Sequence, residues 1–269
     1  MRVMVSGSFD DIRSRHVRLL EEAAKLGSCH VVLWSDALVT RLTGHPPKFP
    51  QPERRYFLEA IRFVDGVTVV EDLATADALP ELEADMWVVP EDEDTPGRRR
   101  AAEERGLVYH VLTEGELAGF PVPEEARWLQ PSSRPKVIVT GCYDWLHTGH
   151  IRFFEEASTF GDLYVAVGND RNVRHLKGAG HPFFHQEERR YMVQAIRYVT
   201  QAVLTKGMGW MDAAPNIEEI RPDIYIVNED GDRPEKRAFC AERGLQYVVL
   251  HRAPRPGLPR RSSTELRGF

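Results

Sequence analysis

The chain has 269 residues, of which 42% are hydrophobic and 28% are charged, a composition typical of a soluble globular protein with room for two domains. The formal net charge of −6 at pH 7 argues against extensive nucleic-acid binding, which usually requires a basic face. The sequence has no apolar run of membrane-spanning length, no signal-peptide pattern and three cysteines without zinc-ligand spacing, so we expect a protein of the reducing cytoplasm.

The N-terminal half opens with a predicted strand that leads through a turn into a helix, and this segment occurs twice in the chain. The stretch from Val3 to His16 is repeated from Val137 to His150, and about a third of positions 3–36 match at this fixed offset. The register then shifts by one residue, so that Glu-Arg-Arg-Tyr56 matches Glu-Arg-Arg-Tyr191. The repeat predicts two homologous domains, each of ordinary domain size.

The segment between the two copies differs from both in composition. Residues 114–134 are rich in Pro, Gly, Glu and Ser, which is typical of an ordered or semi-rigid connector. We therefore predict a first domain over 1–113, a linker over 114–134 and a second domain over 135–269.

In the C-terminal half, short apolar runs alternate with amphipathic helical patterns. Strands are predicted at 137–140, 163–167, 202–205, 224–227 and 247–250, and helices at about 151–159 and 187–198. Such alternation predicts an α/β fold: two tandem Rossmann-like domains, each a parallel sheet flanked by helices. Ligands of such sheets bind beyond the carboxyl ends of the strands.

The segment that follows the strand at 137–140 carries the candidate chemistry. His147 and His150 lie three residues apart at the start of a helix, whose free N–H groups and dipole attract phosphate, and Gly149 lets a phosphate approach the backbone. A histidine pair with this spacing is also found without any function or as metal ligands, but its position after a strand favours phosphate chemistry. In the first copy, Arg13 and Arg15 replace His147 and Gly149, which predicts one working and one degenerate site.

Two motifs together resemble a known family. Gly141-Cys-Tyr-Asp-Trp-Leu-His-Thr-Gly-His150 and Arg261-Ser-Ser-Thr-Glu-Leu-Arg267 are similar to the HxGH and terminal Ser-Thr signatures of the cytidylyltransferase-like nucleotidyltransferases. The resemblance covers the second half and, more weakly, the first. The glycerol-3-phosphate, phosphocholine and phosphoethanolamine cytidylyltransferases are the most similar members. Phosphoethanolamine enzymes also carry two such domains, but their N-terminal domain is usually the active one, whereas here the C-terminal half holds the intact motif.

The resemblance implies roles for individual residues. It implies His147, His150 and Lys177 as catalytic residues that bind triphosphate oxygens, Arg197 as the ligand of the acceptor phosphate, and Asp144 near a magnesium ion. The alternatives are a solvated loop for Lys177 and a structural ion pair for Arg197. The nucleotide-binding residues that it implies are Gly141, Cys142, Tyr143, Asp144, Gly149, Asp230, Arg261, Ser263 and Thr264. Asp230 is equally well explained as an exposed turn residue, and Ser263 and Thr264 as an ordinary helix cap.

The implied function is a magnesium-dependent cytidylyltransferase. It would transfer CMP from CTP to a phosphorylated alcohol or sugar, such as phosphoethanolamine or glycerol 3-phosphate, and release pyrophosphate. An ATP-dependent adenylyltransferase and a non-catalytic nucleotide-binding scaffold are the alternatives. The aromatic residues Tyr143, Trp145 and Trp210 would suit a trimethylammonium group or belong to the core. An internal pseudo-dimer or a homodimer would give the degenerate domain a structural role.

Overall fold

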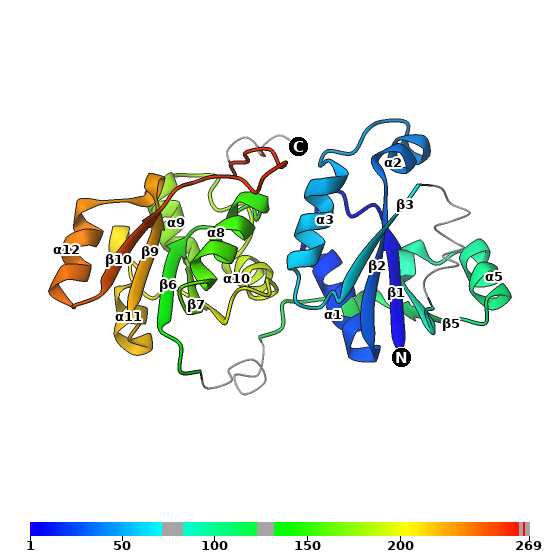
Figure 1. Ribbon diagram of the computed structural model, residues 1–269, viewed down its shortest axis with the longest axis horizontal. Coiled ribbons are helices and arrows are strands. Elements are labelled where there is room, and N and C mark those ends of the chain that lie inside the picture. Colours follow the sequence, from blue (N-terminus) through cyan, green and yellow to red (C-terminus); the bar gives the residue numbers. More distant parts are fainter. Residues whose placement is uncertain (72–82, 123–131, 264–265, 267–269) are drawn as a thin grey trace. The chain divides into compact units, whose positions relative to one another are not determined.

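The computed structural model describes residues 1–71, 83–122, 132–263 and 266. It divides the chain into two compact units, Met1–Gly119 and Phe120–Phe269 (Figure 1). Each unit contains a parallel five-stranded sheet with flanking helices, so the predicted fold of two tandem Rossmann-like domains is confirmed. Of the predicted linker, 114–119 belongs to the first unit, and 123–131 lies outside the described residues.

The first unit has the strand order β3-β2-β1-β4-β5, and each neighbouring pair is parallel. Its elements are β1 (Arg2–Gly7), α1 (Ser14–Leu26), β2 (Ser28–Trp34), α2 (Asp36–Thr43), α3 (Gln51–Ala60), β3 (Gly66–Val70), β4 (Met86–Pro90), η1 (Glu91–Glu93), α5 (Pro96–Glu104), β5 (Val108–Leu112) and α6 (Glu114–Leu117).

The second unit repeats this topology in the order β10-β9-β6-β7-β8. Its elements are β6 (Lys136–Gly141), α8 (Thr148–Ser158), β7 (Asp162–Val167), α9 (Asp170–Lys177), α10 (Gln186–Gln194), β8 (Gln201–Leu204), η2 (Gly209–Met211), α11 (Ala214–Ile220), β9 (Ile224–Asn228), η3 (Glu229–Gly231), α12 (Pro234–Glu242) and β10 (Gln246–Leu250). Among the described helices of both units, none has the length and apolar character that a membrane crossing requires.

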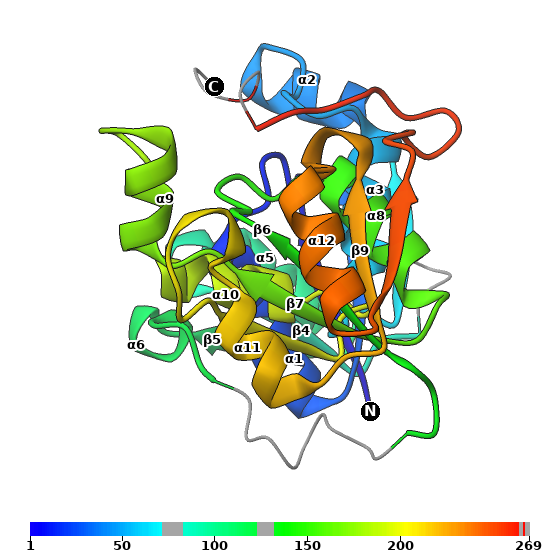
Figure 2. The ribbon, with the colours of Figure 1, turned by 90° about the vertical axis from the view of Figure 1, so that its left-hand side faces the viewer.

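The second sheet is covered by helices on both faces. Helices α8 and α10 lie on one face and α11 and α12 on the other, and Figure 2 looks onto the face of α11 and α12. Under these two helices, Ile138, Tyr225 and Val227 of the sheet pack against Ile217 and Cys240. Because side chains alternate along a strand, a sheet covered twice needs near-continuous apolar strands, which explains the runs seen in the sequence.

The helix predicted over 187–198 ends earlier than expected, at Gln194. Its side chain accepts a hydrogen bond from the backbone N–H of Ala202 at 2.7 Å, at the start of β8. Ile196 and Val199 are both buried, and the tight turn that replaces the last helical residues buries them beside the sheet. Helical periodicity continues through this turn, so the sequence pattern alone does not reveal where the helix ends.

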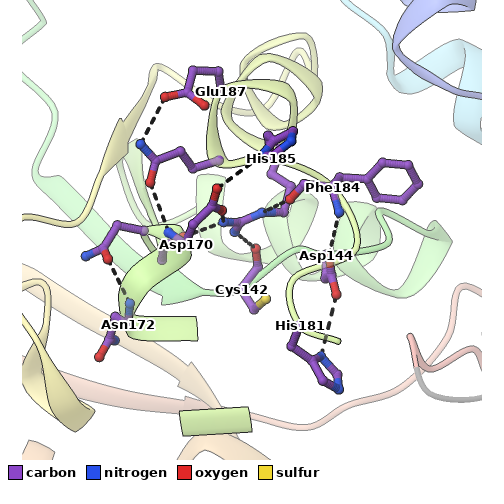
Figure 3. Close-up of polar contacts among 12 residues, drawn as sticks. Cys142, Asp144, Asp170, Asn172, His181, Phe184, His185 and Glu187 are labelled. Carbon is purple, nitrogen blue, oxygen red and sulfur yellow. Dashed lines mark hydrogen bonds and ion pairs between the residues drawn. The ribbon is translucent and has the colours of Figure 1, made fainter. Parts of the chain in front are cut away.

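A buried arginine joins the segments at the carboxyl edge of the second sheet. The Arg189 guanidinium is 1% exposed and donates to the carbonyls of Gly168 (2.7 Å) and Phe184 (2.9 Å) and to that of Cys142. It also forms an ion pair with Asp170 at 2.7 Å. Figure 3 shows Cys142, Asp170 and Phe184 around this group. A single side chain therefore holds the ends of β6 and β7 and the start of α10 in fixed positions.

The first unit has the same arrangement, built on the other Glu-Arg-Arg-Tyr segment. Arg54 donates to the carbonyls of Phe49 and Trp34, both at 2.9 Å, and to that of Ser8. It pairs with Asp36 at 2.6 Å. The shared sequence of the two copies thus reflects a shared structural requirement at the end of each sheet.

We expect Arg54→Met to destabilise the first unit by about 3 kcal/mol or more, because it leaves three buried carbonyls without their donor. Arg55→Met is the matched control: Arg55 is exposed and pairs with Glu59 on the same helix, so its loss should cost less than about 0.5 kcal/mol. Hydrogen exchange of the β1 and β2 amides measures the opening free energy of this unit. Equal costs for the two variants would contradict the assigned role of Arg54.

Candidate functional site

A pocket of about 220 Å³ opens at the carboxyl end of the second sheet. It lies beyond the ends of β6 and β9. Strands β7 and β8 are added on one side of β6 and strands β9 and β10 on the other, and ligands of parallel sheets usually bind at such a switch point. Ten of the residues implicated by the sequence line it: Gly141, Cys142, Tyr143, Asp144, His147, Gly149, His150, Lys177, Asp230 and Ser263. Tertiary structure thus brings together segments that are more than one hundred residues apart in the chain.

His147 is the N-cap of α8. Its Nδ1 accepts a hydrogen bond from the backbone N–H of Gly149 at 3.1 Å, which satisfies one of the free donors of the first helical turn. With Nδ1 as acceptor, the neutral ring carries its proton on Nε2. This Nε2 is buried and has no hydrogen-bond partner among the described residues. A buried donor without a partner in the wall of a pocket is a feature that a bound ligand would satisfy.

His150 lies directly beside His147. The two rings are stacked with centroids 3.9 Å apart, and the His150 Nδ1 accepts from the backbone N–H of His147 at 3.4 Å. Burial, with the nearby Arg252 and Arg261 guanidiniums, lowers the pKa of His147 to about 3. Burial and the neighbouring His147 likewise lower the pKa of His150. Both rings are therefore neutral near pH 7, and the histidine pair offers hydrogen bonds rather than positive charge.

Two glycines and one strained residue shape the floor of the pocket. A Cβ at Gly149 would lie 2.9 Å from the His147 ring, and one at Gly141 would lie 2.7 Å from the Tyr143 ring. Tyr143 itself has a φ of 52°, a region that is unfavourable for a bulky side chain, and its equivalent Phe9 has a φ of 47°. The turn after β6 and the turn after β1 thus share this left-handed residue, although Asp11 in the first unit also has a positive φ, of 59°, and its equivalent Trp145 does not.

The positive charge of the pocket comes from residues on other elements. Lys177 ends α9, Lys236 lies in α12, and Arg252 follows β10, and all three line the pocket. Arg252 forms an ion pair with Asp230 at 2.7 Å. Of these three, Lys177 was predicted from the sequence, whereas Lys236 and Arg252 were not. The position of Arg252 directly after a strand end was a usable signal for it, because such residues lie at the ligand edge of a parallel sheet.

The lining of the pocket includes two carboxylates, Asp144 and Asp230, for the expected magnesium ion. Among the described residues, no group of three or more His, Cys, Asp or Glu side chains has a metal-binding arrangement. The buried Asp144 carboxylate accepts from the backbone N–H groups of Phe183 and Phe184 through Oδ1, and its Oδ2 lies 3.7 Å from His181 Nδ1 (Figure 3). Magnesium usually keeps several waters and needs only one or two carboxylates beside substrate phosphates. The residues present therefore fit an ion that arrives on a nucleotide, and Asp144 would be a carboxylate to hold it.

Two of the expected residues do not line this pocket, and a third is not among the described residues. Arg197 is exposed and does not line the described pocket. Arg261 lines an adjacent hollow, where its carbonyl accepts from Arg252 Nη2 at 3.2 Å. Thr264 lies outside the described residues, whereas the Ser263 hydroxyl donates to the carbonyl of Trp145 at 3.3 Å.

In the first unit, ion pairs occupy the equivalent region. Arg13, at the position of His147, pairs with Asp11 at 2.8 Å. Arg15, at the position of Gly149, pairs with Asp92 at 2.7 Å and with Glu114. By the alignment of the two copies, Asp92 corresponds to Asp230 and Glu114 to Arg252. The first unit thus has Arg15 in place of Gly149 and Glu114 in place of Arg252, and these two residues pair with each other where the second unit has its pocket.

The low pKa of His147 predicts a pH dependence of stability. A histidine in the unfolded chain takes up a proton near pH 6.5, but His147 in the folded protein does so only near pH 3, so the unfolded state binds more protons between these values. The free energy of unfolding of the second unit should therefore fall as the pH drops below 6.5. The contribution of His147 should be about 2 kcal/mol between pH 6.5 and 5.

His147→Asn keeps a helix cap and removes this titration, so the variant should lose less stability than the wild type over that range. Hydrogen exchange of the β6 and β7 amides at pH 6.5 and 5 measures the difference. Identical losses in both proteins would contradict the assignment of a neutral, buried His147.

Comparisons with known proteins agree with the fold and the motifs. A cytidylyltransferase-like family model matches residues 4–133 and 138–269. The FAD synthase of Aciduliprofundum boonei is 36% identical over 118 residues, which are 43% of this chain and 76% of that protein. The FAD synthase of Methanospirillum hungatei is 42% identical over 134 residues, 49% of this chain and 82% of that protein. The bifunctional protein HldE of Koribacter versatilis is 39% identical over 121 residues, 45% of this chain but only 23% of that protein. Because the family model covers nearly the whole chain, this protein belongs to the cytidylyltransferase-like family.

Proposed function

We propose that the second unit is a nucleotidyltransferase that moves a nucleotidyl group from a nucleoside triphosphate to a phosphorylated acceptor and releases pyrophosphate. The observation that carries the proposal is the unsatisfied Nε2–H of His147, which is buried in the wall of a pocket at a helix N-terminus. Helix N-termini bind phosphate through backbone N–H groups and dipole, and Lys177 and Arg252 add positive charge.

The donor nucleotide is proposed from the relatives. FAD contains an adenine nucleotide. Similarity to the FAD synthases named above therefore favours ATP as the donor for this protein. CTP, which the motifs suggest, is the alternative, because the roles proposed for the pocket residues concern the phosphates, which ATP and CTP share. We therefore propose ATP as the donor and keep CTP as the competing outcome of the test.

In the proposed reaction, an oxygen of the acceptor's phosphate attacks the α-phosphorus of the donor. A new phosphoanhydride bond forms to the α-phosphate, and the bond between the α- and β-phosphates breaks, so that pyrophosphate leaves with its bonding electrons. The neutral His147 ring donates its Nε2–H to an α-phosphate oxygen, and Lys177 balances the charge on the leaving group. Magnesium, when bound, would neutralise part of the charge of the triphosphate, and Asp144 would be a carboxylate that helps to hold it.

The first unit lacks the groups to which the proposed transfer is assigned. Arg13 and Arg15 are engaged by Asp11, Asp92 and Glu114, so the site has neither the histidine donor nor free arginines for a triphosphate. We propose that this unit does not catalyse the reaction.

His150→Ala should reduce kcat by about a hundredfold or more, because the variant loses a ring that supports His147 at the reacting phosphate. His16→Ala in the first unit is the matched control. His16 also accepts a hydrogen bond at Nδ1 from a backbone N–H at its helix start, from Arg13 at 3.1 Å, so both variants lose an equivalent structural contact. Steady-state pyrophosphate release should be near normal for His16→Ala. Equal activity in the two variants would contradict a catalytic site in the second unit.

Pyrophosphate release should depend on one nucleotide when ATP, CTP, GTP and UTP are each supplied with magnesium and a panel of phosphorylated alcohols, sugars and FMN. We expect ATP to support turnover with one acceptor of the panel. Turnover with CTP alone would replace the proposed donor and confirm the cytidylyltransferase interpretation. Nucleotide binding without release for any acceptor would favour the non-catalytic scaffold.

A further inference from the structure

A second pocket of about 160 Å³ adjoins the first one. The two share a wall formed by the end of β6 and by two cations, Lys177 and Lys236. The other wall of the second pocket comes from α9 and the segment before α11, including Asn172, Trp210 and Asp212. A ligand in the second pocket would therefore lie next to a triphosphate in the first.

Lys236 is the most deeply buried of the cations that line the two pockets. It is 8% exposed, and its Nζ donates to the carbonyl of Gly231 at 3.2 Å. An ammonium group has three donors, and neither an ion-pair partner nor a second acceptor for Lys236 is found in the part of the chain that the structure describes. Burial lowers the pKa of Lys236, and the Asp212 charge opposes this shift. A buried cation with so few partners favours an anionic ligand.

The first unit shows what Lys236 lacks. The equivalent residue, Arg98, also donates to a carbonyl five residues earlier, that of Glu93, at 3.0 Å. The distance to the centroid of the aromatic ring below is 5.9 Å in both cases, from Arg98 to Trp87 and from Lys236 to Tyr225. Arg98, however, also pairs with the Glu93 carboxylate at 2.7 Å, and Gly231 stands at the position of Glu93. In the second unit, the carboxylate that corresponds to Glu93 is absent, while Lys236 keeps the contacts that Arg98 makes with a carbonyl and an aromatic ring.

We propose that Lys236 binds the phosphate of the acceptor, and that the second pocket holds the rest of the acceptor molecule. This inference rests on the proposed function of the second unit. It replaces Arg197, which does not line either pocket, as the ligand of the acceptor phosphate. A phosphate at the shared wall would have its oxygens directed toward the α-phosphorus bound beside His147.

The residues of the second pocket indicate a hydroxylated acceptor rather than a quaternary ammonium compound. The Arg233 guanidinium lies 4.6 Å from the centroid of the Trp210 ring and occupies one of its faces. Neither Tyr143 nor Trp145 lines the second pocket, so the three aromatic residues form no cage for a trimethylammonium group there. The Asp212 carboxylate, which accepts from Asn172 at 2.8 Å, offers further lone pairs to a hydroxyl group.

The test uses inorganic phosphate as the probe and the full-length chain. Phosphate is titrated calorimetrically into the protein saturated with an α,β-methylene triphosphate analogue, which occupies the first pocket and is not cleaved. Lys236→Met should weaken phosphate binding about tenfold or more, whereas Lys236→Arg should stay within about threefold of the wild type. Lys206→Met is the matched control, because Lys206 is exposed and pairs with Glu219 away from both pockets, and its phosphate affinity should be unchanged.

Gly231→Glu provides a second variant that leaves Lys236 in place. A Cβ at Gly231 meets no atom closer than 3.9 Å, and a glutamate there would reproduce the carboxylate that pairs with Arg98. It should weaken phosphate binding as Lys236→Met does, and in both variants the affinity for the triphosphate analogue should fall less than the affinity for phosphate, because Lys236 and Gly231 also line the first pocket.

Unchanged phosphate affinity in both variants would overturn the proposal. An equal loss of phosphate and analogue affinity would also overturn it, because Lys236 would then belong to the donor site. Failure of the proposed function is a separate result: the wild-type protein would release no pyrophosphate with any donor, whereas the phosphate titration does not require turnover.

Discussion

A buried arginine at the carboxyl edge of each sheet is the constraint on which the rest of the structure depends. Arg189 and Arg54 each donate to three backbone carbonyls and pair with one aspartate, and so fix the loops that leave two adjacent strands. In the second unit one of those loops leads directly into His147. Burying a charged guanidinium away from water is costly, and only this complete set of partners makes the burial favourable. The geometry of the proposed phosphate site therefore depends on an interaction that takes no part in the proposed chemistry.

The start of α8 combines a structural and a functional role in one side chain. His147 caps the helix through Nδ1, and this contact directs its Nε2–H into the pocket. Burial keeps the ring neutral, so it can donate a hydrogen bond without repelling the neighbouring cations. Positive charge is supplied instead by Lys177, Lys236 and Arg252, which come from three other elements. Division of hydrogen bonding and charge among separate residues lets a buried site accept a polyanion.

The two units show how one fold supports an open site or a closed one. In the first, Arg15 in place of Gly149 pairs with Asp92 and Glu114, and Arg98 pairs with Glu93. In the second, Gly149 stands at the position of Arg15 and Gly231 at that of Glu93, so Lys236 lacks the carboxylate that pairs with Arg98, whereas Arg252 pairs with Asp230. The strand order of both units is nevertheless the same, and so is the strained residue after the first strand. A few side chains at the strand ends thus distinguish the proposed phosphate site of the second unit from the ion pairs of the first.

The sequence by itself determined the repeat, the α/β fold, most strands and the cluster around His147, because these depend on local periodicity and on residues close together in the chain. Only the tertiary structure decided that α10 ends at Gln194, that Arg197 lies outside the pocket and that Lys236 and Arg252 line it. Lys236 and Arg252 lie about 90 and 105 residues after His147, and parallel strands bring such distant segments to one edge of the sheet. Whether a cation there is paired internally depends on contacts in space, which no spacing along the chain reveals.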